Sequence, residues 1–154
     1  MSTGSGIEPI ILTVSSAARP AAAWRAVTDP AQVSRWFADA SPLGEVGSRY
    51  AIDFGDGSQI DGAVVDLDPG RRFAHTWHWA GDEPVAVTRV AWDVESGVGG
   101  GSRITLQHDG WTEAAGGSTA RDDHAGYWRD YLDGLAALLE AEPGRPGQDD
   151  PEPA

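Results

Sequence analysis

Between Thr119 and Glu140 the apolar residues recur at intervals of three and four, the pattern of a helix with one apolar face. These residues are Tyr127, Trp128, Tyr131, Leu132, Leu135, Leu138 and Leu139. Thr119 and Asp122 resemble a capping box at the start of the helix, and Pro143 with Gly144 ends it. The pattern predicts a long C-terminal helix over residues 119–141. Its three large aromatic residues need a broad concave surface on which to be buried.

The N-terminal part of the chain predicts one strand followed by two short helices. Residues 10–16 are apolar and β-branched, which is typical of a strand. Pro20 opens a short helical segment that ends near Val27. Asp29 and Pro30 supply the cap and the first position of the second helix. The second helix carries three apolar residues: Val33, Trp36 and Phe37.

From residue 47 onward the apolar positions alternate with polar ones, which favours strands that bury one face. Turn sequences rich in Gly, Asp and Pro separate these runs. The predicted strands are 49–54, 59–67, 73–79, 85–94 and 103–108. Four residues share one face of the third of these: Phe73, His75, Trp77 and Trp79. Strands joined by hairpins form an antiparallel sheet, and the long helix must cover its apolar face. The expected fold class is therefore α+β.

The length of 154 residues favours a single domain with a substantial core. We expect that domain to cover residues 7–141, after a disordered leader of residues 1–6. Residues 142–154 are acidic and rich in proline, and we expect them to form a disordered tail. The chain has no cysteine, which excludes disulfides and thiolate metal sites.

The formal net charge of −13 argues against nucleic acid as a partner, because binding to the phosphate backbone requires basic patches. All 11 basic residues are arginines, scattered singly. The sequence shows no secretory signal and no apolar run long enough to span a membrane. We therefore expect a cytoplasmic protein without a membrane partner, either a monomer or a weak homodimer.

Several motifs, taken in order, resemble a known family. They are Pro20…Trp24…Val27-Thr28-Asp29-Pro30…Trp36-Phe37, then Gly62-Ala63-Val64…Asp68-Pro69…Arg72-Phe73…Thr76-Trp77, then residues 101–111 (GSRITLQHDGW), and Trp128 with the leucines that follow it. Their order and spacing resemble the activator of heat-shock-protein-90 ATPase homologue-like family. This family belongs to the START/SRPBCC (birch-pollen-allergen-like) superfamily.

The resemblance implies a helix-grip fold. In this fold a curved antiparallel sheet wraps around a long C-terminal helix and encloses a cavity, and two short helices follow the first strand. Members of the superfamily include lipid and hormone carriers as well as polyketide cyclases and aromatases. One departure from the family pattern is Tyr127, which stands where the family usually has glycine. We expect this large side chain to fill part of the cavity.

The candidate ligand-binding residues are aromatic and histidine side chains that the fold would bring together. They are Trp36, Tyr50, His75, Trp77, Trp92, His108, Tyr127, Trp128 and Tyr131. Ligand cavities are mostly apolar with a few polar groups, which tyrosine, tryptophan and His108 supply. The alternative is that these residues simply form a solid core.

The sequence carries no catalytic, metal or cofactor signature. The four histidines, His75, His78, His108 and His124, do not have the spacing of a metal site, and no nucleophile-elbow pattern is present. General acid–base catalysis by His108 or His124 stays open as an alternative, because imidazole titrates near neutral pH.

Three classes of function follow from these observations. The first is a carrier or sensor that binds a small hydrophobic, flat and aromatic molecule between the long helix and the sheet. The second is an enzyme of the polyketide cyclase, aromatase or hydrolase type that uses the same cavity. The third is a chaperone-associated regulatory protein with a role in the stress response, as the family name suggests.

Overall fold

A seven-stranded antiparallel sheet and a long helix make up most of the protein, for which a computed structural model describes residues 7–42 and 44–141. The predicted leader and tail lie outside the described residues. The elements are β1 (Ile10–Ser16), α1 (Pro20–Thr28), α2 (Pro30–Trp36), β2 (Asp39–Ala40), β3 (Arg49–Asp53), β4 (Gln59–Asp68), β5 (Arg72–Trp79), β6 (Thr88–Ser96), the 3₁₀ turn η1 (Val98–Gly100), β7 (Ser102–Asp109), the 3₁₀ turn η2 (Glu113–Ala115) and α3 (Gly117–Ala141). This order confirms the predicted α+β helix-grip fold.

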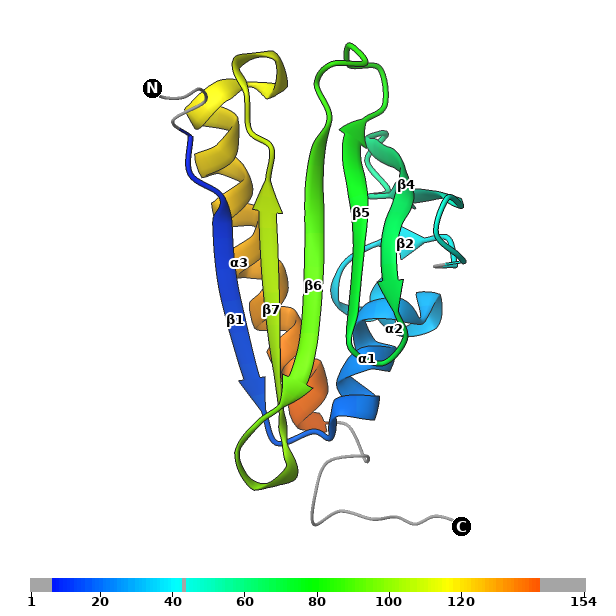
Figure 1. Cartoon of the computed structure of the whole chain (residues 1–154), viewed down its shortest axis with the longest axis vertical. Coiled ribbons are helices and arrows are strands. Elements are labelled where there is room, and N and C mark those ends of the chain that lie inside the picture. Colours follow the sequence, from blue (N-terminus) through cyan, green and yellow to red (C-terminus); the bar gives the residue numbers. More distant parts are fainter. Residues whose placement is uncertain (1–6, 43, 142–154) are drawn as a thin grey trace.

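The strands lie in the order β1-β7-β6-β5-β4-β3-β2, so only the first strand is displaced from its place in the sequence. Strand β1 lies at one edge of the sheet, where it pairs antiparallel with β7 (Figure 1). Ile10 is opposite His108 in this pairing. The pairing of β4 with β5 shifts between Val64 and Asp66. Such a bulge bends a strand and increases its twist, which helps the sheet to curl.

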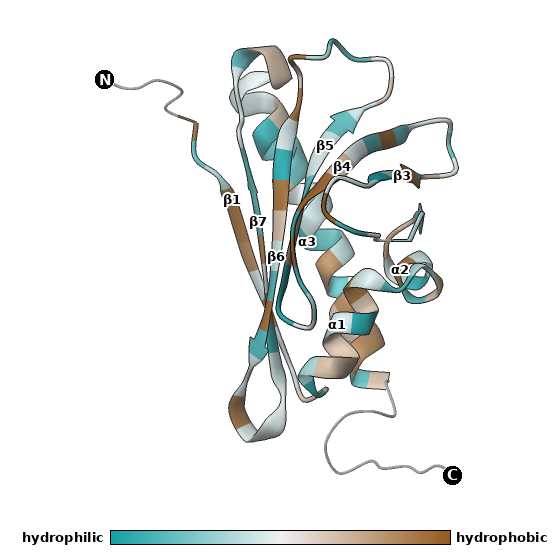
Figure 2. Ribbon diagram, turned by 45° about the vertical axis from the view of Figure 1, so that its right-hand side comes forward, coloured by the Kyte–Doolittle hydropathy of each residue, from teal (hydrophilic) through white to brown (hydrophobic). Residues whose placement is uncertain are grey.

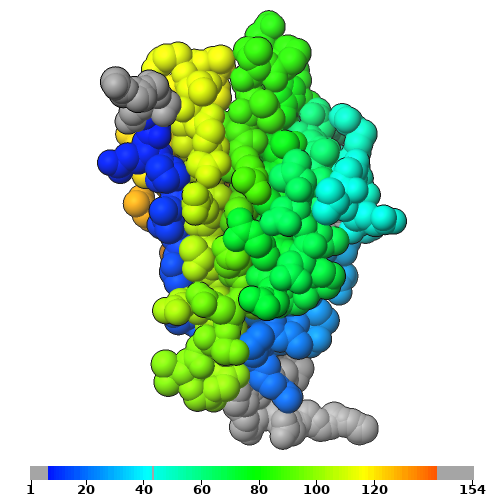
Figure 3. All heavy atoms as spheres, in the orientation of Figure 1, coloured from blue at the N-terminus to red at the C-terminus, as the bar shows by residue number. Residues whose placement is uncertain are grey.

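Helix α3 runs along one face of the sheet, behind β1 and β7 in the view of Figure 1. Its buried side includes Trp128, Leu132, Leu135 and Leu139, as the helical spacing predicted. The strands carry their own apolar stripes, shown in brown in Figure 2. In the space-filling view of Figure 3, which shows the opposite face of the sheet, the strands hide most of α3. The predicted packing of the long helix against the sheet is thereby confirmed.

The start of α3 differs from the prediction by two residues. The Thr112 hydroxyl accepts a hydrogen bond from the backbone N–H of Ala115, and Gly116 then takes a left-handed conformation (φ 105°) that turns the chain into the helix. Thr119 consequently lies within the first turn of α3 and not at its cap. At the same end Arg121 donates to the backbone carbonyls of Glu8 and Pro9 at 3.1 and 3.0 Å, which fastens the helix to the entry of β1.

Two further details of the strands were predicted wrongly. Residues 85–87 belong to the turn between β5 and β6, because β6 begins only at Thr88. The short strand β2 was missed, since a two-residue strand carries no alternating pattern. No helix in the described part of the chain is long and apolar enough to cross a bilayer.

Leu135 provides a test of the packing between α3 and the sheet, because its side chain is fully buried. We expect Leu135→Ala to lower the free energy of unfolding by about 2–5 kcal/mol, through lost burial and the cavity left behind. Urea denaturation followed by fluorescence measures this change. Val98→Ala is the matched control, because Val98 is 98% exposed, and it should have almost no effect. An equally small effect at Leu135 would contradict the packing described here.

Candidate functional site

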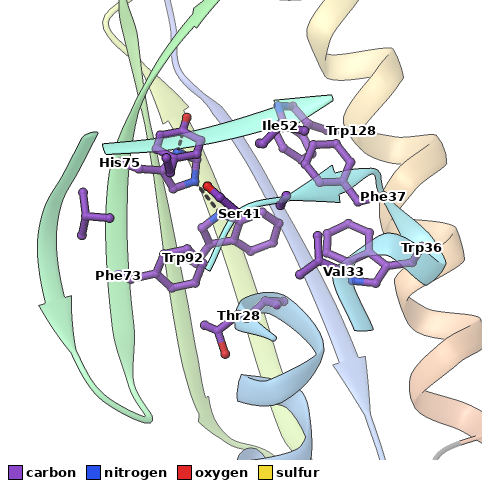
Figure 4. A pocket seen from close by; sticks show the side chains of 14 residues that line it. Thr28, Val33, Trp36, Phe37, Ser41, Ile52, Phe73, His75, Trp92 and Trp128 are labelled. Carbon is purple, nitrogen blue, oxygen red and sulfur yellow. Dashed lines mark hydrogen bonds between the residues drawn. The ribbon is translucent and has the colours of Figure 1, made fainter. Parts of the chain in front are cut away.

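A small pocket, partly open to solvent, lies between α1, α2, the sheet and α3. It has a volume of about 60 Å³, and Figure 4 shows side chains from all these elements pointing into it. Its lining residues are Val27, Thr28, Val33, Trp36, Phe37, Ala40, Ser41, Tyr50, Ile52, Val64, Phe73, His75, Trp92 and Trp128. Pockets that enclose a drug-sized ligand measure roughly 300–1,000 Å³. The inner cavity therefore has room for a few water molecules and not for a ligand of that size.

His75 is the polar centre of the wall of this cavity (Figure 4). Its Nε2 accepts a hydrogen bond from the indole N–H of Trp92 at 3.3 Å, so its Nδ1 carries the proton and donates to the Tyr50 hydroxyl at 2.8 Å. That hydroxyl in turn donates to the carbonyl of Thr76. Gly62 lies opposite Tyr50 on β4, where a Cβ atom would come within 2.6 Å of both the Thr76 carbonyl oxygen and the Tyr50 ring. The absence of a side chain at Gly62 thus permits this close chain of hydrogen bonds.

His108 is fully buried on β7 and links the sheet to α3. Its Nδ1 accepts a hydrogen bond from the indole N–H of Trp128 at 3.0 Å, and its Nε2 donates to the Thr88 hydroxyl at 2.7 Å. The Thr88 hydroxyl lies 3.4 Å from the carbonyl of Trp77, to which it donates. Both ring nitrogens of His108 are therefore paired with protein groups.

His124 on α3 repeats this arrangement near the surface. Its Nδ1 donates to the carbonyl of Ala120 at 2.7 Å, and its Nε2 accepts from the indole N–H of Trp79 on β5 at 3.0 Å. Each of the three histidines is thus an acceptor for one tryptophan, and each has a partner on both ring nitrogens. A general base needs a free nitrogen within reach of the substrate, so catalysis by His108 or His124 would first require one of these hydrogen bonds to break.

The surroundings of the three histidines keep their rings neutral. Burial lowers the pKa of His75 to about 4, against a smaller opposing effect of the Thr76 carbonyl. Burial, together with repulsion from His124 and His75, holds the pKa of His108 well below its usual value. Burial also lowers the pKa of His124, although the Ala120 carbonyl and the charge of Asp123 oppose the shift. Neutral rings are what the three hydrogen bonds require, because an imidazolium cannot accept.

A second hollow, much larger and open to solvent, lies between the N-terminal half of α3, strand β5 and the turns beside it. We call it the aromatic groove; its volume is about 610 Å³. Its lining residues are Phe37, Phe54, Asp56, Ser58, Trp77, Trp79, Asp82, Ala120, Asp123, His124, Tyr127, Trp128 and Tyr131. Seven of these are Phe, Trp or Tyr, and the rings of all but Tyr127 lie close to one another, as Phe37 does with Tyr131 at 4.8 Å between ring centres.

Tyr127 does not fill the inner cavity, contrary to the prediction. Its side chain is 54% exposed and lines the rim of the aromatic groove, with its ring 5.7 Å from that of His124. The neighbouring Trp128 takes the inward position and is buried. The departure from the family's glycine thus adds an aromatic wall to the open groove and leaves the inner cavity unaffected.

The structure separates the nine candidate residues into four groups. Trp36, Tyr50, His75 and Trp92 line the inner cavity, Trp77, Tyr127 and Tyr131 line the aromatic groove, and Trp128 contributes to both. His108 lines neither of these two spaces. Sequence reasoning did not select the groove residues Phe37, Phe54 and Trp79. Trp79 shares the predicted strand face with Trp77, so that face was the signal available for it.

Within residues 7–42 and 44–141, no group of three or more His, Cys, Asp or Glu side chains is arranged to hold a metal ion.

The fold and the groove define a helix-grip domain of the α+β class. The chain belongs to the family of activator of Hsp90 ATPase homolog 1-like proteins, whose sequence profile matches residues 17–140. No curated protein sequence shows significant similarity to it.

Solved structures share this fold. DynU16, a protein in the dynemicin biosynthetic locus, is 28% identical with a TM-score of 0.75, over 92% of this chain and 50% of that one. This chain therefore spans about half the length of DynU16. Protein MLL2253 from Mesorhizobium loti is 20% identical with a TM-score of 0.76, over 86% and 96% of the two chains. The Aha1 dimer from Colwellia psychrerythraea is 24% identical with a TM-score of 0.72, over 88% and 98%. The last two similarities show the fold alone.

The neutral histidines give the domain a predictable sensitivity to acid. The folded pKa of His75 lies below the unfolded value, so the unfolded chain binds more protons between about pH 6.5 and about 4. The stabilisation is complete above pH 6.5 and falls as the pH drops through this window. We expect His75 alone to account for a loss on the order of 3 kcal/mol. Urea midpoints measured across this pH range test the expectation.

Two variants separate His75 from general acid effects. His75→Gln keeps an acceptor for Trp92 and a donor for Tyr50 but does not titrate, so it should shrink the acid-induced loss. His78→Gln removes a histidine from the more exposed part of β5 and should leave the loss in place. Equal pH profiles for the wild type and His75→Gln would show that His75 does not cause the loss.

Proposed function

We propose that the chain binds a small, flat, apolar molecule in the aromatic groove between α3 and the sheet, as a carrier or sensor. The observation that carries the proposal is the contrast between the two spaces. The inner pocket is only about 60 Å³, whereas the aromatic groove is about 610 Å³ and is lined by seven aromatic side chains. A volume of that size lies within the range of small-molecule sites.

The packing of the groove supports a ring-shaped ligand. Phe54, Trp79 and Tyr131 are only partly buried, so their rings retain apolar surface that a ligand would cover. Aromatic rings prefer stacked or edge-to-face partners and gain about 0.5–1.5 kcal/mol per pair beyond the burial of area. A flat ring system placed between α3 and β5 would meet such partners on two sides.

The hydrogen bonds of the histidines favour binding over catalysis. His124 is the imidazole that lines the groove, and Trp79 and Ala120 already occupy its two nitrogens. An enzyme of the cyclase type would need an acid–base group free to face its substrate. DynU16, which shares this fold, belongs to a biosynthetic locus, and an enzyme acting in such a pathway is the second candidate function.

Ligand titration tests the proposal directly, because Trp77, Trp79 and Trp128 line the groove and act as fluorescent reporters. Polycyclic phenols and flavonoids should quench tryptophan fluorescence and raise the melting temperature, since a ligand that binds only the folded state stabilises it. Fatty acids serve as a comparison without rings and should bind more weakly. If no ring compound shifts either signal at high micromolar concentration, the groove is not a ligand site.

Tyr127→Ala locates the bound molecule. Tyr127 is more than half exposed, so its loss should leave the fold intact while removing one wall of the groove. We expect the affinity for ring compounds to fall by about three- to tenfold, the scale of one lost aromatic contact. Val65→Ala, a comparable change at an exposed apolar residue of β4 outside the groove, should leave the affinity unchanged. Equal effects of the two variants would place binding elsewhere.

A further inference from the structure

Three carboxylates surround the aromatic groove, each contributed by a different part of the fold. Asp56 lies in the turn between β3 and β4, Asp82 in the turn between β5 and β6, and Asp123 in the first half of α3. All three residues are exposed. Among the described residues that line the groove, none is an arginine, so the negative charge has no basic partner there.

His124, the one groove-lining residue with a titratable nitrogen, does not offset this negative charge. His124 is held neutral by burial, which lowers its pKa, and by its role as the acceptor for Trp79. The charge of Asp56 also acts on the groove wall itself. Burial raises the pKa of the Tyr131 hydroxyl, and the negative charge of Asp56 raises it further. The groove is thus a concave aromatic surface in a negative electrostatic field.

A buried donor in the same wall has no partner. The Trp77 side chain is almost fully buried and contributes to the groove, and its indole N–H makes no hydrogen bond within the described residues. The indole groups of Trp79 and Trp128, on either side of it, are both paired with histidines. A buried donor left unpaired is costly, so the indole of Trp77 is less well satisfied than those of its two neighbours.

We propose that the groove binds an organic cation, namely a flat aromatic ring system that carries a protonated amine, in preference to a neutral or anionic ring compound. This proposal rests on the proposed function of the groove and specifies the charge of its ligand. The ring lies against the aromatic walls, and the positive charge faces Asp56, Asp82 and Asp123 at the rim. Aromatic faces attract cations through their negative quadrupole, and the carboxylates add a Coulomb attraction. The acidic surface of the whole chain, with its net charge of −13, acts in the same direction.

Three acridines of nearly equal shape and different charge test this proposal. At neutral pH, 9-aminoacridine is a cation, acridine is neutral and acridine-9-carboxylate is an anion. Calorimetric titration of the full chain with each probe should give the order cation, neutral, anion from tightest to weakest. Added salt should weaken the cation most, because screening acts on the exposed carboxylates.

Single substitutions then assign the charge preference to the rim. Asp56→Asn, Asp82→Asn and Asp123→Asn each remove one charge without altering the shape of the groove. Each should weaken the binding of 9-aminoacridine by about two- to fivefold, as expected for an exposed charge pair, and leave acridine unchanged. Asp133→Asn is the matched control, because Asp133 is an exposed aspartate of the same helix that lies outside the groove.

The possible outcomes separate this inference from the proposed function. A preference for the cation that the three rim variants reduce and Asp133→Asn does not would support the inference. If acridine and 9-aminoacridine bind equally and the rim variants change nothing, the groove is a ligand site without charge selection, and the inference is wrong. If the three variants and the control weaken binding equally, the net charge of the chain and not the rim selects the cation, which also overturns it. If none of the three acridines binds although a phenol or flavonoid does, the inference is wrong and the proposed function stands. If no ring compound of either panel binds, both fail.

Discussion

Hydrogen bonds between tryptophan and neutral histidine hold the interior of this domain together. A buried indole N–H requires an acceptor, and an imidazole nitrogen can accept only while it carries no proton. Trp92 with His75, Trp128 with His108 and Trp79 with His124 all follow this rule. Two of the three pairs join α3 to the sheet, so the position of the helix depends on the protonation state of these histidines.

These pairs also decide where a ligand has room. Trp92 and Trp128 donate hydrogen bonds to histidines of the sheet. Together with Trp36 and Phe73 they fill most of the space between the helices and the sheet. Aromatic side chains that the sequence suggested as a ligand cavity therefore serve largely as core. The buried tryptophan N–H groups are mostly paired with acceptors of the protein, with Trp77 as the exception. The open space lies one layer further out, along the groove that Tyr127 and Tyr131 border.

The sequence predicted the fold well, because each element leaves a local pattern. The leucines of α3 and the alternation along β5 were sufficient to place both elements. The position of Tyr127 was not predictable in the same way, since Tyr127 and Trp128 are adjacent on the helix and periodicity does not decide which one faces inward. The tryptophan–histidine pairs join residues 17, 20 and 45 positions apart, so no local sequence pattern predicts them. The candidate site was therefore anticipated in its residue types and in its place between the helix and the sheet, but not in which of those side chains line the groove.

The openness of the groove has a kinetic consequence. A carrier that encloses its ligand must open before exchange, and that motion limits how fast the ligand enters and leaves. Here the pairing of Trp79 with His124 fixes one wall while the other side faces solvent. A molecule bound on such a surface equilibrates with its surroundings without any rearrangement of the chain. For the proposed ligand, the residence time would then be set by the strength of its contacts with the groove alone.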